Sequence, residues 1–337
     1  MKNIIKQLKE TGESTSLEVD GGTVEVTHLD KELWPSYPGG KAATKRDLLL
    51  YLAAVSPYML PHLEDRPITL KRYPGGIGGE HFYQRHYEHE LPPFMDAVEL
   101  PDEESAKHQP YLVCNNLASL LWLGQMANIE FHTWFSRINP LPELPKNKDK
   151  EYLAGHPDFM IFDIDPYIYS GKEPEGAEPE LHEAGFKKGC HAALWLKEVI
   201  EGLKFKTFVK TSGRTGIHVY VPIERKLDYT AVRAAAKTIC QHVQKKHPSD
   251  ITLEWSVEKR RGKVFLDFNQ NVESKTLAAI YSPRPNPEAS VSMPIKWEEI
   301  EKIYPTDFTI FNAPQRLEKT GDLWSGILDA KGDLASL

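Results

Sequence analysis

The stretch Phe159-Met-Ile-Phe-Asp-Ile-Asp-Pro166 decides how this sequence of 337 residues is interpreted. An apolar run that leads into two aspartates and stops at a proline is typical of a buried strand. Side chains alternate faces along a strand, so Asp163 and Asp165 point one way while Phe162 and Ile164 point the other. Two neighbouring carboxylates repel each other unless a cation lies between them or one is protonated. Oxygen ligands at this spacing suit Mg²⁺ or Mn²⁺, although most isolated Asp-x-Asp triplets are solvated turn residues.

A second pattern, over residues 205–222, predicts two strands joined by the short turn Ser212-Gly-Arg-Thr-Gly216. Successive backbone N–H groups in such a turn can form an anion-binding nest. Ser212 would add a hydroxyl group and Arg214 a positive charge. His218 follows closely enough to face the same anion. The alternative is an ordinary hairpin with a half-buried histidine.

A third pattern, Val264-Phe-Leu-Asp-Phe268, predicts another apolar strand that carries a single acid. The basic turn Arg260-Arg-Gly-Lys263 precedes it, and Asn269-Gln-Asn271 follows. An isolated carboxylate on an apolar strand is costly to bury without a cation or a partner. Asp267 is therefore a candidate third ligand, provided that the fold brings this strand beside the paired aspartates.

Taken in this order, the three patterns resemble the archaeo-eukaryotic primase superfamily. More narrowly, they resemble the polymerase domain of bacterial ligase D, which repairs double-strand breaks with Ku in non-homologous end joining. The similarity covers roughly residues 20–330, and the further similar segments are Val26–Pro35, Arg66–Pro74, Phe131–Trp134 and Tyr281–Arg284. The resemblance implies an α+β fold of the primase type: an RRM-like catalytic sheet with helices, and an N-terminal α/β lobe packed on it.

The activity implied by the resemblance is nucleotidyl transfer by a DNA polymerase or primase. A primer 3′-OH attacks the α-phosphate of an incoming NTP or dNTP, and two Mn²⁺ or Mg²⁺ ions stabilise the attacking and leaving oxygens. Asp163, Asp165 and Asp267 would be the catalytic and metal-binding residues. The nucleotide-binding positions would be Ser212, His218, Lys71, His132, Gln270 and Arg284. The family commonly has a lysine where this chain has Thr215, which leaves the cationic phosphate contact open.

Further positions resemble those with which the family binds DNA, namely Lys31, Lys45, Arg72, Phe82, Tyr83 and Arg260. Lys31 and Lys45 match positions that hold the 5′-phosphate of a gapped or recessed end. Phe82 and Tyr83 match an aromatic pair that stacks on bases, a contact that tolerates any base sequence. Arg260 resembles a loop residue that reaches the template or a second DNA end. The alternative interpretation, from residue type alone, is that the two lysines are ordinary solvated surface residues and that Phe82 and Tyr83 are packed in the core.

Composition limits these interpretations only weakly. Hydrophobic residues make up 40% and charged residues 26%, as in ordinary globular proteins. The sequence has no apolar run of about 18 residues and no signal-peptide pattern, so we expect a cytoplasmic protein without a membrane partner. The resemblance implies that it is associated with the nucleoid. Three dispersed cysteines argue against a cysteine-rich zinc site. The net charge of −7 weighs against a nucleic-acid partner, but bases cluster at residues 41–46, 71–72 and 258–263, which allows a local basic groove.

Local patterns predict how the chain is organised. We expect an N-terminal arm over residues 1–15, an N-terminal lobe over about 16–145, a catalytic lobe over about 150–300 and a C-terminal segment over 301–337. Within these parts, the patterns predict a strand pair at 17–27, helices from residue 45 and at 115–128, 191–203 and 229–246, a hinge at 141–150 and a mobile loop at 167–189. No Lys-x-Asp-Gly motif is present, so we expect no ligase domain.

Two other functions remain open at this stage. One is a non-catalytic module that binds DNA ends and recruits repair partners; the retention of all three acids argues against it. The other is a divalent-metal phosphohydrolase that uses the same carboxylates. His132 also has a simpler explanation, because it can be a packed core histidine beside Trp134. The partners that the resemblance implies are broken, gapped or primer-template DNA with a 5′-phosphate, together with Ku and a DNA ligase.

Overall fold

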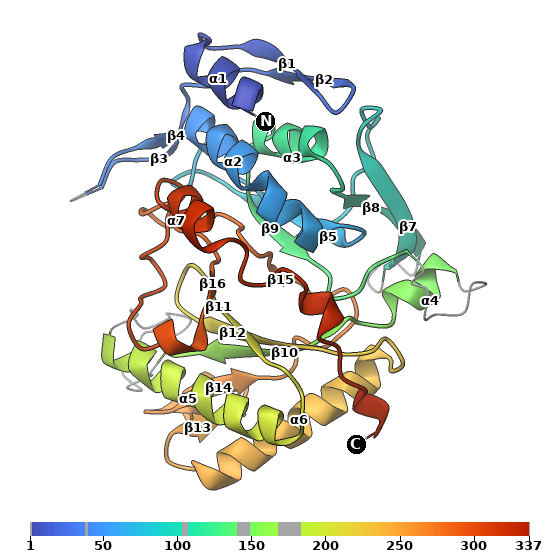
Figure 1. Ribbon diagram of the computed structural model, residues 1–337, viewed down its shortest axis with the longest axis vertical. Coiled ribbons are helices and arrows are strands. Elements are labelled where there is room, and N and C mark those ends of the chain that lie inside the picture. Colours follow the sequence, from blue (N-terminus) through green and yellow to red (C-terminus); the bar gives the residue numbers. More distant parts are fainter. Residues whose placement is uncertain (1, 38–39, 103–106, 140–148, 168–182, 337) are drawn as a thin grey trace. The chain divides into compact units, whose positions relative to one another are not determined.

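The computed structural model describes residues 2–336 apart from 38–39, 103–106, 140–148 and 168–182 (Figure 1). The chain divides into two compact units. Unit 1 comprises Met1–Ala154, Thr276–Met293 and Phe308–Asp322, and unit 2 comprises Gly155–Lys275, Pro294–Asp307 and Leu323–Leu337. This division differs from the expected one because the chain after residue 275 contributes to both units. Within the described part, no helix is both long and apolar enough to cross a membrane.

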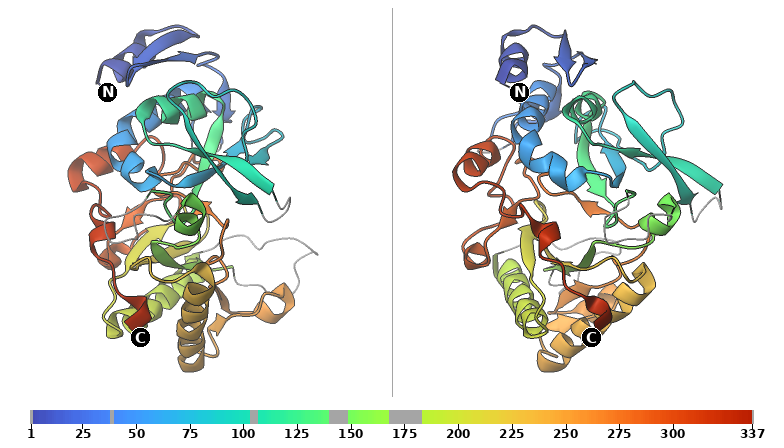
Figure 2. Two further views of the ribbon diagram at one scale, coloured as in Figure 1. Left: turned by 90° about the vertical axis from the view of Figure 1, so that its right-hand side faces the viewer. Right: turned by 45° about the vertical axis from the view of Figure 1, so that its right-hand side comes forward.

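Unit 2 is built on a six-stranded sheet in the order β13-β14-β10-β12-β11-β16. Neighbouring strands are antiparallel except β13 and β14, which are parallel. Its elements are β10 (Phe159–Asp165), α5 (Glu183–Gly202), β11 (Phe208–Thr211), β12 (Ile217–Pro222), α6 (Tyr229–Lys246), β13 (Ile251–Thr252), η1 (Val257–Arg260), β14 (Val264–Asp267), β16 (Pro294–Ile295), η2 (Trp297–Glu299), η3 (Ile327–Asp329) and η4 (Leu334–Ser336). Helices α5 and α6 pack on each other and on this sheet (Figures 1 and 2).

The two helices of unit 2 begin for different reasons. Helix α6 has the predicted bounds, and the Asp228 carboxylate caps it by accepting a hydrogen bond from the Ala231 N–H at 2.8 Å. Helix α5 begins at Glu183 rather than at residue 191, so the predicted loop is wrong from residue 183 onward. Gly189 suggested a loop, but a Cβ there would lie only 2.9 Å from Pro166 Cβ. Glycine therefore lets the helix pass close to the end of β10. The rest of the predicted loop, and most of the predicted hinge, lie outside the described residues.

Unit 1 holds a second sheet, in the order β15-β9-β5-β8-β7, with β6 paired to β5. Its elements are α1 (Lys2–Glu10), β1 (Thr15–Val19), β2 (Gly22–Val26), β3 (Glu32–Trp34), β4 (Ala43–Thr44), α2 (Lys45–Leu63), β5 (Pro67–Arg72), β6 (Phe82–Gln84), β7 (Asp96–Asp102), β8 (Lys107–Val113), α3 (Leu117–Gln125), β9 (Asn128–Thr133), α4 (Lys150–Ala154), β15 (Leu277–Ala278) and α7 (Ala313–Thr320). Helix α2 packs on α3, which contacts β9.

Short-range signals in unit 1 are confirmed. The β1–β2 hairpin turns at Asp20 and Gly21, whose φ angles of 51° and 78° are those that a tight two-residue turn requires. Thr44 and Asp47 form the capping box that starts α2. Helix α3 is shorter than predicted, because the Asn116 side chain caps it and it ends at Gln125.

Candidate active site

The three predicted catalytic aspartates share one face of the unit 2 sheet. Asp163 on β10 lies directly opposite Asp267 on the antiparallel strand β14. Asp165 is two residues further along β10 and therefore points to the same side. Ile164 points the other way, towards Gly189 of α5. The fold thus supplies the link that the sequence pattern alone could not, since it pairs two strands that are distant in the chain.

Asp267 is buried without full compensation of its charge. Asp267 is only 4% exposed. One carboxylate oxygen accepts a hydrogen bond from the Asn269 N–H at 2.7 Å, and the other accepts one from Gln270 Nε2 at 3.1 Å. Burial raises the pKa of Asp267, although these hydrogen bonds and the charge of Arg260 oppose the shift. Gln270, expected at the nucleotide, is here bound to this carboxylate.

The paired aspartates each lie beside a basic side chain. His218 Nε2 on β12 is 3.4 Å from Asp163 Oδ1, and Arg260 Nη1 is 3.7 Å from Asp165 Oδ2. The Arg260 guanidinium also stacks 3.7 Å from the centroid of the Phe265 ring and is 7% exposed as a residue. Arg260 was expected on DNA, and this structure places it against the acidic cluster. His218 was expected near the phosphates, and it adjoins the same cluster.

The donor set fits a hard divalent cation. Like charges on directly opposed strand positions destabilise a sheet unless they are compensated, and Asp163 and Asp267 occupy such positions. In the described ranges, no group of three or more His, Cys, Asp or Glu side chains forms a ready-made metal cage. The residues that would hold a cation are Asp163, Asp165 and Asp267, because their oxygen ligands match the preference of Mg²⁺ and Mn²⁺.

The turn between β11 and β12 gathers backbone donors around one point. Ser212 Oγ accepts hydrogen bonds from the N–H groups of Arg214 (3.2 Å), Thr215 (3.1 Å) and Gly216 (2.8 Å). The amides converge as an anion nest would require, and the hydroxyl oxygen of Ser212 occupies their meeting point. A Cβ at Gly216 would lie 2.8 Å from the Ile164 carbonyl oxygen, so only glycine fits against β10. This close approach fixes the turn beside the strand that carries the paired aspartates.

In unit 1, three predicted nucleotide-binding residues surround an acid that the sequence analysis missed. Lys71 Nζ lies 3.1 Å from Glu130 Oε2, and Arg284 Nη2 lies 3.1 Å from Glu130 Oε1. His132 Nε2 is 3.8 Å from the same Oε1 atom. Glu130 is the single acid of β9, but Asn128, His132 and Thr133 make this strand less apolar than the one that carries Asp267. The signal that identified Asp267 is therefore weaker at Glu130.

The predicted aromatic pair is exposed. Phe82 is 45% and Tyr83 59% exposed, so the alternative that both are core residues is wrong. Lys71 Nζ lies 5.0 Å from the centroid of the Tyr83 ring, and the Arg72 guanidinium lies 5.2 Å from that of Phe82. These distances are within the range of cation–π attraction. Strand β6 therefore presents two aromatic rings that are each supported by a cation of β5.

The two lysines expected at a 5′-phosphate are neighbours in unit 1. The Lys45 N–H donates to the Lys31 carbonyl at 2.9 Å, next to the β3–β4 pair. Lys45 is 6% exposed, and its Nζ donates to the Thr27 carbonyl at 3.1 Å. Burial, and then the charge of Lys31, lower the pKa of Lys45. Lys45 is therefore not an ordinary surface lysine, whereas Lys31 is exposed.

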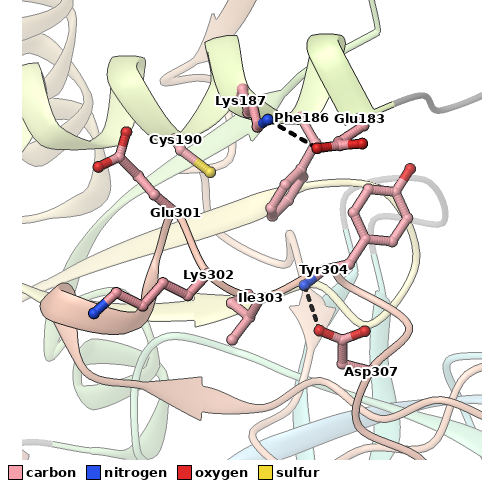
Figure 3. Close-up of a pocket in the computed structure, with 9 residues that line it drawn as sticks. All are labelled: Glu183, Phe186, Lys187, Cys190, Glu301, Lys302, Ile303, Tyr304 and Asp307. Atoms are coloured by element: carbon pink, nitrogen blue, oxygen red, sulfur yellow. Dashed lines mark hydrogen bonds and ion pairs between the residues drawn. The ribbon is translucent and has the colours of Figure 1, made fainter.

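A separate hollow of about 550 Å³ lies in unit 2 between α5 and residues 301–307 (Figure 3). Phe186 and Tyr304 form its apolar side, and none of the predicted site residues lines it. Burial, together with the charge of Glu301, raises the pKa of the Cys190 thiol to about 12. The thiol therefore stays protonated at neutral pH and is a poor nucleophile.

Comparison with known proteins identifies the family of this chain. A family profile described as "LigD, primase-polymerase domain" matches residues 44–324. The chain belongs to this family. It is 27% identical over 312 residues to the multifunctional non-homologous end joining protein LigD of Mycolicibacterium smegmatis, covering 93% of this chain and 37% of that protein. It is 28% identical over 300 residues to the bifunctional LigD of Bacillus subtilis, covering 88% and 43%. The chain thus spans less than half the length of these relatives.

A solved structure supports the same assignment at the level of the fold. The polymerase domain of Mycobacterium tuberculosis ligase D, in complex with DNA, matches with a TM-score of 0.76 and 27% identity. The match covers 91% of this chain and 98% of the domain. The expected α+β fold of the ligase D polymerase domain is therefore confirmed.

Proposed function

We propose that this chain is a DNA-dependent nucleotidyltransferase that adds NTPs or dNTPs to a primer 3′-OH at gaps or broken ends, in non-homologous end joining. The observation that carries the proposal is the set of three aspartates on one face of the β10–β14 pair, with the Ser212 turn fixed beside β10. Membership of the LigD primase-polymerase family supports the reaction class. A related domain that carries DNA supports the substrate class.

Each group in unit 2 has a role in this proposal. Asp163, Asp165 and Asp267 would bind two divalent cations, which when bound supply positive charge to the attacking and leaving oxygens. The Ser212 turn would exchange the hydrogen bonds that its backbone N–H groups make with Ser212 Oγ for hydrogen bonds to phosphate oxygens. His218, 3.4 Å from Asp163, would hold that carboxylate in place and contact a phosphate. Gln270 would exchange its hydrogen bond with Asp267 for one with the nucleotide.

The other residues that the proposal uses belong to unit 1, except Arg260. Lys71, His132 and Arg284 would bind the nucleotide. The exposed aromatic pair and Arg72 on β5 and β6 would bind DNA bases and backbone, as would Arg260 in unit 2. Lys31 and Lys45 would hold the 5′-phosphate of a gap. Ku and a DNA ligase would be the partners, at the nucleoid in the cytoplasm.

Primer extension tests the proposal directly. The protein is incubated with a labelled primer–template, NTP and Mn²⁺, and only a polymerase lengthens the primer. A non-catalytic end-binding module would shift the DNA in a gel without extending it. A phosphohydrolase would release phosphate and leave the primer unchanged. Either of these outcomes contradicts the proposal.

The sugar preference is a finer part of the same proposal. From the resemblance to ligase D alone, we expect ATP to be incorporated at least as well as dATP. Its physical basis would be polar contacts to the 2′-hydroxyl, because a site that hydrogen-bonds a hydroxyl loses binding when the hydroxyl is absent. Competition between the two nucleotides on one template measures the ratio. A strong preference for dATP would contradict the expectation and leave the polymerase assignment intact.

A further inference from the structure

Glu130 is the buried centre of a polar cluster in unit 1. It is 1% exposed, and its carboxylate contacts Lys71 and Arg284 at 3.1 Å each. The hydroxyl of Tyr73 donates to Glu130 Oε2, also at 3.1 Å. One carboxylate oxygen therefore contacts Lys71 and Tyr73, while the other contacts Arg284. Each cation is held by its own oxygen atom.

Strand register explains why these groups meet. Glu130 on β9 lies directly opposite Lys71 on β5, and Lys71 lies opposite Tyr83 on β6. The three side chains form one row across three strands. Arg284 enters from outside the sheet, with its backbone fixed by hydrogen bonds to Ser290 (2.8 Å) and to the Trp34 indole (3.0 Å). The backbones are thus held by the fold, but the tips of two long, flexible side chains need a further contact to fix their positions.

The cluster carries more positive than negative charge. Burial by itself would raise the pKa of Glu130, but the charge of Arg284, a hydrogen bond from His132 and the charge of Lys71 hold it well below its usual range. Burial lowers the pKa of His132, despite its proximity to Glu130, so His132 is neutral at neutral pH. Lys71 and Arg284 together then outweigh the single carboxylate. The excess positive charge suits a phosphate group.

We propose that Glu130 is a positioning residue, which holds the Lys71 ammonium and the Arg284 guanidinium at the spacing needed to bind a nucleotide triphosphate. This inference rests on the proposed function, because that function assigns Lys71 and Arg284 to the nucleotide. A carboxylate that only neutralised nearby cations would weaken anion binding. A carboxylate that positions them strengthens it. The two roles predict opposite signs for the loss of its charge.

Glu130→Gln separates these roles, because it removes the charge and keeps the shape. The probes are ATP and inorganic triphosphate, titrated without DNA against a bound fluorescent ATP analogue. We expect both affinities to fall about tenfold or more, since truncating one member of a buried charge pair leaves the others misplaced. In primer extension, the KM for ATP should rise while kcat changes much less. Tighter or unchanged binding by Glu130→Gln overturns the proposal.

Matched variants keep the test decisive. Glu99→Gln makes the same change at an exposed position of β7 in the same unit, and should bind both probes as the wild type does. Glu130→Asp covers the case in which Glu130→Gln does not fold. It keeps the charge but is one methylene too short to reach both cations, so wild-type affinity in this variant also overturns the proposal. In a Lys71→Met background, Glu130→Gln should cost less than in the wild type, because coupled residues are not additive.

The outcomes also separate this inference from the function on which it rests. If wild-type protein binds neither ATP nor inorganic triphosphate, the nucleotide-binding function fails. If the wild type binds both probes and Glu130→Gln binds them equally well, the function stands and only the positioning role of Glu130 fails.

Discussion

The acidic cluster of unit 2 and the Glu130 cluster of unit 1 bury carboxylates in opposite electrostatic surroundings. Asp267 lacks full compensation, and burial raises its pKa. Glu130 is just as buried, but Arg284, His132 and Lys71 overcome the effect of burial and lower its pKa. The direction of each pKa shift indicates which charge the surroundings of the carboxylate lack. The first cluster has an excess of negative charge that suits cations, and the second has an excess of positive charge that suits phosphates.

The largest effect expected from this comparison is on catalysis. Asp163→Ala, Asp165→Ala and Asp267→Ala should each lower primer extension by at least about a thousandfold, because cation-assisted stabilisation of the transition state is worth several kcal/mol. Folding should be retained, since removing one of several repelling carboxylates does not destabilise the sheet. Extension rates with Mn²⁺ and circular dichroism measure the two quantities, with Glu99→Ala as the control. Near-normal extension by Asp267→Ala would falsify the three-acid site.

The sequence predicted unit 2 better than unit 1 because the relevant signals are local. The strands and helices predicted over 157–270 from alternating apolar runs and from capping residues such as Asp228 are present in that order, and the structure adds the short strand β13 and the helix η1 before β14. The start of α5 was missed because the sequence does not show that Gly189 faces Pro166.

The sequence alone could not predict which residues are paired inside the two sites. Asp163 meets Asp267, and Lys71 meets Glu130, only through strand register. Register depends on which strands become neighbours and on which faces are buried, and neither is encoded in the separate segments. The polar residues themselves could be singled out by their cost of burial, as Asp267 was. Their partners could be assigned only from the fold or from resemblance.

The next largest effect is on stability in unit 1. Glu130→Gln should lower the free energy of unfolding at pH 7 by about 3–5 kcal/mol, because it leaves the Lys71 and Arg284 side chains, each only 11% exposed, without their counter-charge. The pKa of Glu130 is lower in the folded state, so its contribution is complete above the ordinary glutamate pKa of about 4.3 and is lost as the pH falls through the folded value. Urea unfolding of both proteins at pH 7 and pH 4 tests the size and the trend. Equal stability at pH 7 would contradict the compensated cluster.

Lys31 and Lys45 extend the comparison to two neighbouring cations, where burial and then the charge of Lys31 lower the pKa of Lys45. Alanine at either position should weaken binding to a gapped duplex with a 5′-phosphate by about tenfold, and should affect the 5′-hydroxyl duplex much less. A terminal phosphate carries more charge than a backbone diester, so two neighbouring lysines can distinguish them.

Binding of both duplexes at two salt concentrations provides the measurement for these lysines, and Lys6→Ala, at an exposed position of α1, is the control. Ordinary backbone contacts would instead reduce both affinities equally and lower the salt dependence. Equal losses on the two duplexes would therefore remove the 5′-phosphate site and leave DNA binding itself in place.

The smallest effect has the opposite sign to that of Glu130→Gln. Because burial raises the pKa of Asp267, the folded state is penalised wherever this carboxylate is ionised. Asp267→Asn removes the penalty and should raise the melting temperature at pH 7, without divalent ions, by roughly 1–3 °C. The gain in melting temperature should shrink as the pH falls through the folded pKa of Asp267, and should be gone below the ordinary aspartate value of about 3.9.

Mn²⁺ should stabilise the wild type more than the variant, since a cation that binds the folded state supplies the missing charge. Thermal unfolding with and without Mn²⁺ at several pH values measures all three trends. A lower melting temperature for Asp267→Asn at pH 7 would mean that the Asp267 carboxylate is already compensated, and the contrast between the two clusters would then be lost.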